Sequence, residues 1–389
     1  TIMEHDYFKK TYKDDISEFN LEEARGWIID SMNFIEGKAD VLFVKGILET
    51  RKSNYEISDK YLFKALDIYT KLKKEKGINS INNAIGVNYY RQALYKEALI
   101  YFNKSIAYNE KINNKFDLIY GLYNTGNIYA ETGEFTNAIK NYNKVIKLSK
   151  EVNHKTALTY AQNSLAIIYS TQGNYPKAIS LYKNALYQKE IEKDTLSIAH
   201  TLTSLGSLYL KTGELDKAIN LHKKSLKYAN ELGSKALVVS GKIHLGNIYI
   251  ELKKYDLANQ YYNEALKIAQ FINDKKDEAL CLSNLGSLYL KLNKIKEAQN
   301  YFFESVTLCK EIDNQEQLCY NYTGLGESFF KIFNYNESIK FLELGKSLAN
   351  QIDILEPQKK ATELLSDIYK RKGDFKKALE NHELHKRIS

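Results

Sequence analysis

The segment that determines the fold is LYNTGNIYAETGEFTNA, residues 122–138, because its pattern of small and aromatic residues returns every 40 residues along nearly the whole chain. Gly126 serves as the reference position, with an aromatic residue three positions later and an alanine or serine twelve positions later. Small residues hold the reference position throughout: Gly46, Gly86, Gly126, Ala166, Gly206, Gly246, Gly286, Gly326 and Ser366. A fixed period of this length is the signature of stacked repeats, so we predict one array rather than separate compact domains.

The composition favours helix and excludes several function classes. Only 2 prolines occur in 389 residues, which favours helix nearly throughout. A net charge of +8 permits an acidic partner, but it is too mild for this length to indicate nucleic acid. No run of about 18 apolar residues exists, so we predict no membrane insertion. The sequence begins with Thr1 without a signal-peptide pattern, so we expect a cytoplasmic fragment or processed product.

Each repeat is predicted to contain two helices, A and B. In the third repeat, helix A is expected near residues 115–131 and helix B near 135–152. Gly133 in the turn between them suits the positive φ of a helix C-cap. Pro176 lies at the start of a helix B, where its missing N–H costs little. A second break recurs between repeats, at polar positions such as Asn153.

The core of the array follows from helical periodicity. The small reference residue allows helix B to approach helix A closely, and the alanine or serine twelve positions later does the same from helix B. Aromatic side chains sixteen positions after the reference are expected to fill the gap between repeats: Phe102, Tyr142, Tyr182, Tyr262 and Phe302.

The N-terminal segment fits the repeat poorly. We predict two short helices near residues 4–14 and 20–35, which together form a degenerate helical cap over residues 1–35 with Trp27 in its packing. The repeat array is predicted to occupy residues 36–389.

This order of small, aromatic and turn residues resembles the tetratricopeptide repeat, over about nine units. The usual period of that family is about 34 residues, with a proline that closes helix B. Here Glu110 and Lys150 stand at that position and do not stop a helix, which explains a longer helix B. The resemblance implies an all-α, right-handed solenoid. This long form resembles the repeats of Pins-type scaffolds, kinesin light chains, bacterial peptide-pheromone receptors and bacterial signalling proteins with kinase or DNA-binding domains.

No group of residues predicts catalysis or a cofactor. The Gly324-Leu-Gly326 segment begins like a phosphate loop, but it is expected inside a helix A and lacks a preceding strand. His382 and His385 have metal-ligand spacing without a third ligand nearby, so packing or exposure is the better interpretation. The tyrosines fall mostly on packing positions rather than on a basic face that would bind nucleic acid. The cysteines align with small residues of other repeats and are expected to be buried: Cys281, Cys309 and Cys319.

The remaining candidate surface is the face of the A helices opposite the packing stripe. In the family it resembles, this face lines a concave groove. Polar side chains recur on it or beside it: Asn83, Asn124, Asn127, Asn163, Ser204, His244, Asn247 and Asn284. Repeated amides and hydroxyls suit the N–H and C=O groups of an extended peptide. The resemblance implies peptide-holding roles for Asn124, Asn127 and Asn247, and the packing pattern requires neither Asn124 nor Asn127. Basic residues five positions after the reference favour an acidic segment: Arg91, Lys211, Lys291 and Lys331.

The sequence therefore predicts a non-enzymatic scaffold that binds a protein or peptide, without cofactor or metal, as the interaction or sensor region of a bacterial signalling protein. One alternative is a peptide-pheromone receptor of the Rap type, although those proteins carry a helical bundle before the repeats. Another is the regulatory region of a kinase or cyclase whose catalytic domain lies outside this chain.

Overall fold

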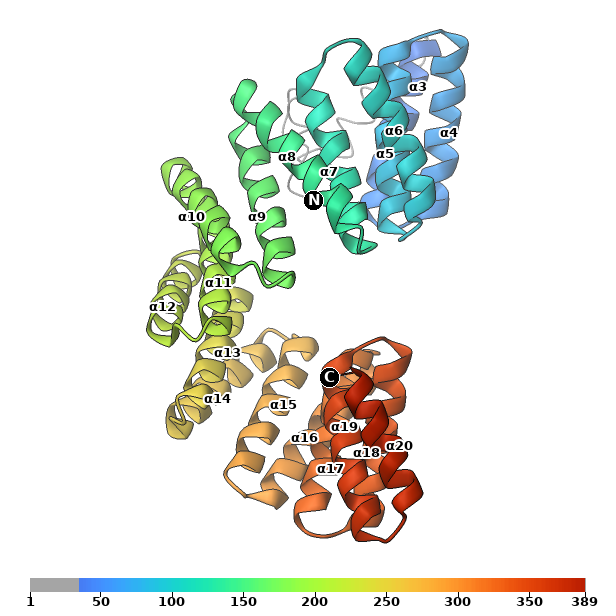
Figure 1. Cartoon of the computed structure of the whole chain (residues 1–389). Helices are drawn as coiled ribbons and strands as arrows, with labels where there is room; N and C mark the ends of the chain where they lie inside the picture. Colours follow the sequence, from blue (N-terminus) through green and yellow to red (C-terminus); the bar gives the residue numbers. More distant parts are fainter. Residues whose placement is uncertain (1–34, 389) are drawn as a thin grey trace. The chain divides into compact units, whose positions relative to one another are not determined.

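The computed structural model describes residues 35–388, which form helices α3 to α20 without a strand (Figure 1). The chain divides into two compact units, Thr1–Lys193 and Asp194–Ser389. The first unit contains α3 (Ile35–Arg51), α4 (Tyr55–Lys71), α5 (Glu75–Arg91), α6 (Tyr95–Lys111), α7 (Lys115–Glu131), α8 (Phe135–Glu151), α9 (Lys155–Thr171) and α10 (Tyr175–Glu192). The second contains α11 (Thr195–Lys211), α12 (Leu215–Glu231), α13 (Lys235–Glu251), α14 (Tyr255–Phe271), α15 (Lys275–Lys291), α16 (Ile295–Glu311), α17 (Gln315–Lys331), α18 (Tyr335–Gln351), α19 (Leu355–Arg371) and α20 (Phe375–Ile388).

The prediction of an all-α array of two-helix repeats is confirmed. Odd-numbered helices are A helices and even-numbered helices are B helices, and α7 and α8 match their predicted ranges to within one residue. Within each unit, every helix packs on its neighbours in the chain, and consecutive A helices also contact one another. The predicted helix near residues 4–14, nearly all of the one near 20–35, and Trp27 lie outside the described residues. The boundary of the N-terminal cap stays a prediction.

Both predicted breaks are single residues with a left-handed backbone. Gly133 has φ of 76°, and Lys253 takes φ of 56° at the equivalent position of a later repeat. The break between repeats has the same geometry at each of its positions: Asn113, Asn153, Lys193, Gly233, Asn273, Asp313 and Asp353. Pro176 lies in the first turn of α10, as expected. The recurring turns therefore depend on one conformation that glycine and asparagine adopt most easily.

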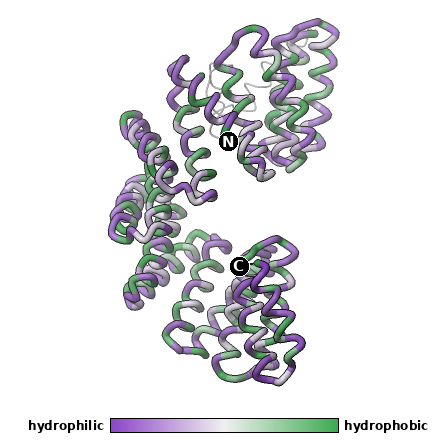
Figure 2. The backbone as a smooth tube through the Cα atoms, viewed as in Figure 1, coloured by the Kyte–Doolittle hydropathy of each residue, from purple (hydrophilic) through white to green (hydrophobic). Residues whose placement is uncertain are grey.

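The small reference residues bring the two helices of a repeat into close contact. A Cβ atom on Gly126 would lie 2.9 Å from the ring of Tyr142. Phe302 lies against two glycines, since a Cβ on Gly286 of its own repeat would be 2.8 Å away and one on Gly324 of the next repeat 2.5 Å away. This confirms that the aromatic residue fills the space between repeats. Hydrophobic and hydrophilic residues are interspersed along the helices (Figure 2).

The glycine, cysteine and histidine residues for which the sequence predicted no chemistry are part of the fold or exposed. Gly324 lies inside α17, so the phosphate-loop pattern belongs to a helix. All three cysteines are buried, as predicted, and burial raises the pKa of the Cys281 thiol to about 12. The ring of His385 lies 3.1 Å from the backbone oxygen of Lys359, whereas His382 is exposed.

Candidate functional site

The candidate surface is the A-helix face, which we define as the side of the A helices that points away from the B helices. In the first unit, α7 contacts both α5 and α9, so their exposed sides adjoin. These three helices bring together Asn83, Asn124, Asn127 and Asn163, with Arg91 at the end of α5. In the second unit, the A helices α11, α13, α15 and α17 carry the other predicted residues: Ser204, His244, Asn247, Asn284, Lys211, Lys291 and Lys331.

Asn127 takes part in the packing of its own repeat. Its side-chain oxygen accepts a hydrogen bond of 2.7 Å from the Tyr142 hydroxyl of α8. Burial raises the pKa of Tyr142, so this hydroxyl stays protonated and donates. The expectation that the architecture does not need Asn127 is therefore wrong, because a buried hydroxyl requires a partner.

The same contact recurs two repeats further on, in the repeat formed by α13 and α14. The Tyr262 hydroxyl donates to the side-chain oxygen of Asn247 at 2.6 Å. The sequence signal for this contact is partial: asparagine stands one position after the reference in two of the three repeats with tyrosine sixteen positions after it, whereas Ile167 accompanies Tyr182. Each asparagine keeps its NH₂ group and one lone pair of its oxygen for a ligand.

Other amides of the A-helix face have no internal partner. The side-chain oxygens of Asn83 and Asn163 are buried and accept no hydrogen bond from any described residue. Asn124 also makes no hydrogen bond within the described part of the chain. Between α7 and α9, the Tyr123 hydroxyl and the Ser164 hydroxyl lie 3.2 Å apart. The first unit therefore presents amides that are held in place by packing but not satisfied by it.

In the second unit, the ring of His244 stacks on another histidine ring. Its ring lies 4.8 Å from the ring of His222 on α12, with an angle of 17° between the planes. His222 is fully buried, and neither of its ring nitrogens has a hydrogen-bond partner among the described residues. Burial, together with the neighbouring His244, lowers the pKa of His222 to about 3, and burial lowers the pKa of His244. Both rings are therefore neutral at physiological pH, and the sequence pattern gave no sign of this stack.

Ser204 and Asn284, also predicted site residues of the second unit, differ in whether their side chains already make a hydrogen bond. The Ser204 hydroxyl donates to the backbone oxygen of His200 on its own helix, at 3.2 Å. In contrast, the side-chain NH₂ of Asn284 on α15 is buried without an acceptor among the described residues. Asn284 therefore has an unsatisfied donor on the A-helix face of the second unit.

The predicted basic residues lie at the last position of their A helices. Arg91, Lys211, Lys291 and Lys331 end α5, α11, α15 and α17. A cation is favoured there because the negative end of the helix dipole and the last carbonyl groups lie nearby. Lys331 shows this directly, since it donates to the Leu290 carbonyl oxygen of α15 at 3.0 Å. These residues thus have a structural reason as well, and the acidic partner stays a prediction.

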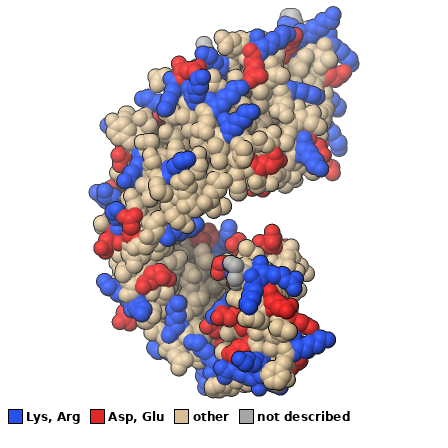
Figure 3. All heavy atoms as spheres, in the orientation of Figure 1, with Lys and Arg blue, Asp and Glu red and all other residues tan. Residues whose placement is uncertain are grey.

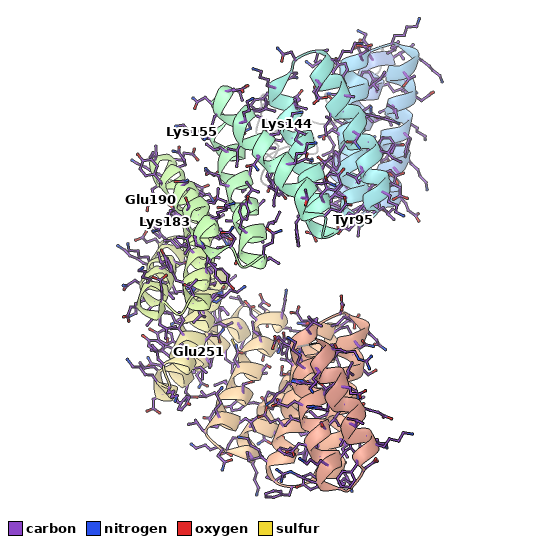
Figure 4. All side chains as sticks on the ribbon, viewed as in Figure 1. Tyr95, Lys144, Lys155, Lys183, Glu190 and Glu251 are labelled. Carbon is purple, nitrogen blue, oxygen red and sulfur yellow. The ribbon has the colours of Figure 1, made fainter. Side chains whose placement is uncertain are left out.

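Basic and acidic side chains are interspersed on the face of the molecule in view in Figure 3. Lys144 on α8 is one example (Figure 4), since it pairs with Glu110 of α6 at 2.6 Å.

Within residues 35–388, no helix has the length and hydrophobicity needed to cross a membrane. Among the same residues, no three His, Cys, Asp or Glu side chains gather as a metal site would require.

Comparison with known proteins agrees with this architecture. The model of the tetratricopeptide repeat family matches residues 117–186, 160–231 and 238–311. No curated protein matches the chain. The apo form of the quorum sensor NprR from B. thuringiensis is 18% identical, with a TM-score of 0.64 over 84% of this chain and 92% of that chain.

Two other solved structures are similar at comparable levels. A signal transduction ATPase with numerous domains from Pyrococcus horikoshii, which has a tetratricopeptide repeat sensor, is 15% identical with a TM-score of 0.64. That match covers 89% of this chain and 53% of that chain. A Rap protein complexed with Competence and Sporulation Factor is 13% identical with a TM-score of 0.57, over 91% of this chain and 98% of that chain. Identities this low show similarity of fold alone.

The stacked helix pairs, the glycine contacts and the left-handed turns define an all-α solenoid of helical repeats. With the matches to the family model, they show that the chain contains tetratricopeptide repeats over residues 117–231 and 238–311, in a form with a period of 40 residues.

Proposed function

We propose that this chain is a protein- or peptide-binding scaffold whose A-helix face holds an extended segment of its partner, and that it acts as the interaction or sensor region of a bacterial signalling protein. The observation that carries the proposal is the pair of unsatisfied amide oxygens on that face in the first unit, those of Asn83 and Asn163; in the second unit, taken by itself, the NH₂ of Asn284 is unsatisfied as well. Buried polar atoms are nearly always hydrogen-bonded, so their missing partners indicate a ligand.

An extended peptide supplies what these amides lack. Its backbone offers an N–H to each free oxygen and a C=O to each free NH₂. Packed helices lie roughly 10 Å apart, and an extended chain advances about 3.3 Å per residue. One repeat therefore corresponds to about three peptide residues, and amides on neighbouring A helices would meet separate peptide units. Among solved relatives, the Rap protein complexed with Competence and Sporulation Factor supports this use of the fold.

The test is to select linear peptides from a random display library on the full chain and to measure their affinity by fluorescence anisotropy. The double variant Asn83→Ala with Asn163→Ala should weaken binding at least about tenfold, because each lost hydrogen bond contributes roughly 0.5–1.5 kcal/mol. Its melting temperature should change little, since both amides lack internal partners. Asn143→Ala with Asn184→Ala, on the exposed sides of α8 and α10, is the matched control. Selected peptides that bind the first variant as tightly as the control would refute the proposal.

A further inference from the structure

In three repeats, an ion pair joins the start of helix A to the end of helix B. It joins the first residue of helix A to the last residue of the following helix B, which lies beside it. The two residues carry opposite charges in each case: Glu75 with Lys111 at 3.6 Å, Lys115 with Glu151 at 3.0 Å, and Lys275 with Glu311. The pairing neutralises a lysine at the edge of each of these repeats.

The repeat formed by α13 and α14 breaks this pattern. Its first residue is Lys235, but its last residue is Phe271 instead of a carboxylate. The Lys235 ammonium lies 3.6 Å from the centre of the Phe271 ring, which is 71% exposed. Within the described part of the chain, no carboxylate lies within ion-pair distance of Lys235. An exposed aromatic ring and a cation without an ion-pair partner therefore stand where the three repeats named above have an ion pair.

These two residues form one wall of a surface pocket of about 390 Å³ in the second unit. Val238 and Ile268 add apolar surface beside Phe271, and Lys267 adds a second ammonium. Asn230 and Gly233, from the end of α12 and the turn after it, complete the lining. Ligand pockets have this character: mostly apolar surface with a few polar groups that fix the orientation of the ligand.

Neither Lys235 nor Lys267 makes an ion pair with a carboxylate of the described residues. Glu264, one turn before Lys267 on α14, is bound by Lys242 and Gln260 and interacts with Lys267 only at longer range. Glu231, next to Asn230, lies 3.8 Å from Lys227. The pocket also lies at the start of α13, where the free N–H groups of the first turn add partial positive charge. Ser234, the residue before α13, makes no side-chain hydrogen bond to them.

We propose that this pocket binds the C-terminal residue of a peptide or protein chain that ends in a large apolar side chain. The terminal carboxylate lies between Lys235 and Lys267, and the side chain packs on Val238, Ile268 and Phe271. A chain terminus suits the site better than a small free acid, because the exposed side of the pocket leaves room for the preceding residues. This site is separate from the A-helix face and does not depend on the function proposed for that face.

The test uses the full chain and a fluorescently labelled peptide, Gly-Ser-Gly-Ser-Leu, with its carboxylate either free or amidated. Only the free form should bind, and Phe271→Glu should weaken that binding at least about tenfold, because the new carboxylate pairs with Lys235 as Glu311 pairs with Lys275. Lys235→Gln with Lys267→Gln should have a similar effect. Lys223→Gln with Lys224→Gln, which changes exposed lysines of α12 outside the pocket, should bind as the parent does.

Four results would overturn the proposal: equal affinity for the amidated peptide, unchanged affinity of Phe271→Glu, no binding of either peptide, or binding of octanoate without binding of either peptide. The last result would assign the pocket to small acids instead. Circular dichroism controls for folding, and Phe271→Glu is expected to fold because Phe271 is largely exposed.

Discussion

Mild acid should destabilise the second unit through His222. This residue is fully buried, and its pKa is lowered from 6.5 to about 3, mainly by burial. When the chain unfolds, the ring becomes solvated and binds a proton below pH 6.5, whereas the folded state does not bind that proton until about pH 3. The unfolded state therefore binds more protons between these values, so stability is lost as pH falls through 6.5.

The size of the effect follows from the two pKa values. Between pH 7 and pH 5, the free energy of unfolding should fall by about 2 kcal/mol through His222 alone, and His244, whose pKa is lowered in the same direction, adds to this loss. The readout is urea denaturation of the full chain at each pH, combined with hydrogen exchange in α12 and α13, since an array opens locally.

His222→Phe is the matched variant, because Phe102 and Phe302 occupy the equivalent position against Gly86 and Gly286. This variant should lose the pH-dependent term while keeping the packing of the repeat. Its stability relative to the parent should therefore rise by about 2 kcal/mol between pH 7 and pH 5. Parallel pH profiles for the parent and the variant would refute the reasoning, because the buried imidazole would then have contributed nothing.

Three further expectations concern the repeat itself, each measured by urea denaturation. Gly126→Ala should lower the free energy of unfolding by about 1–3 kcal/mol, since its Cβ would lie 2.9 Å from the Tyr142 ring. An unchanged free energy would contradict this, because the ring would then move aside without cost. Lys253→Gly should add about 0.5–1 kcal/mol by relieving a φ of 56° on a residue with a side chain, and a decrease would contradict this. Asn127→Ala should cost about 0.5–1.5 kcal/mol because it removes the hydrogen bond that the Tyr142 hydroxyl donates to Asn127. Asn124→Ala should cost little, and equal costs would contradict the difference.

The fold could be predicted from the sequence because the same packing and turn constraints recur in each repeat. A small residue at Gly126 is required by the nearby ring, and Gly133 is required by a left-handed turn. Single exceptions, such as Phe333 with φ of 61°, do not obscure a pattern that the other repeats restore. Periodicity thus reports backbone geometry and packing reliably.

The candidate site was less predictable because its polar residues interact across helices. The position of Asn247 on a helix face does not reveal that Tyr262, fifteen residues later, uses its oxygen. In the same way, His244 occupies the predicted face, but its ring stacks on His222 of the preceding helix. The pocket beside Phe271 could not be predicted from the sequence. It stands out only in comparison with the repeat in which Lys275 pairs with Glu311, because Lys235 at the equivalent position contacts the Phe271 ring instead.

These contacts change which asparagines can report binding. A loss of affinity in Asn127→Ala would be ambiguous, because that change also releases Tyr142 from its hydrogen bond. Asn83 and Asn163 have buried oxygens without internal partners, so their removal changes what a ligand meets without removing a bond of the fold. A ligand that depends on the A-helix face must therefore respond to these two residues more strongly, relative to any change in stability, than to Asn127.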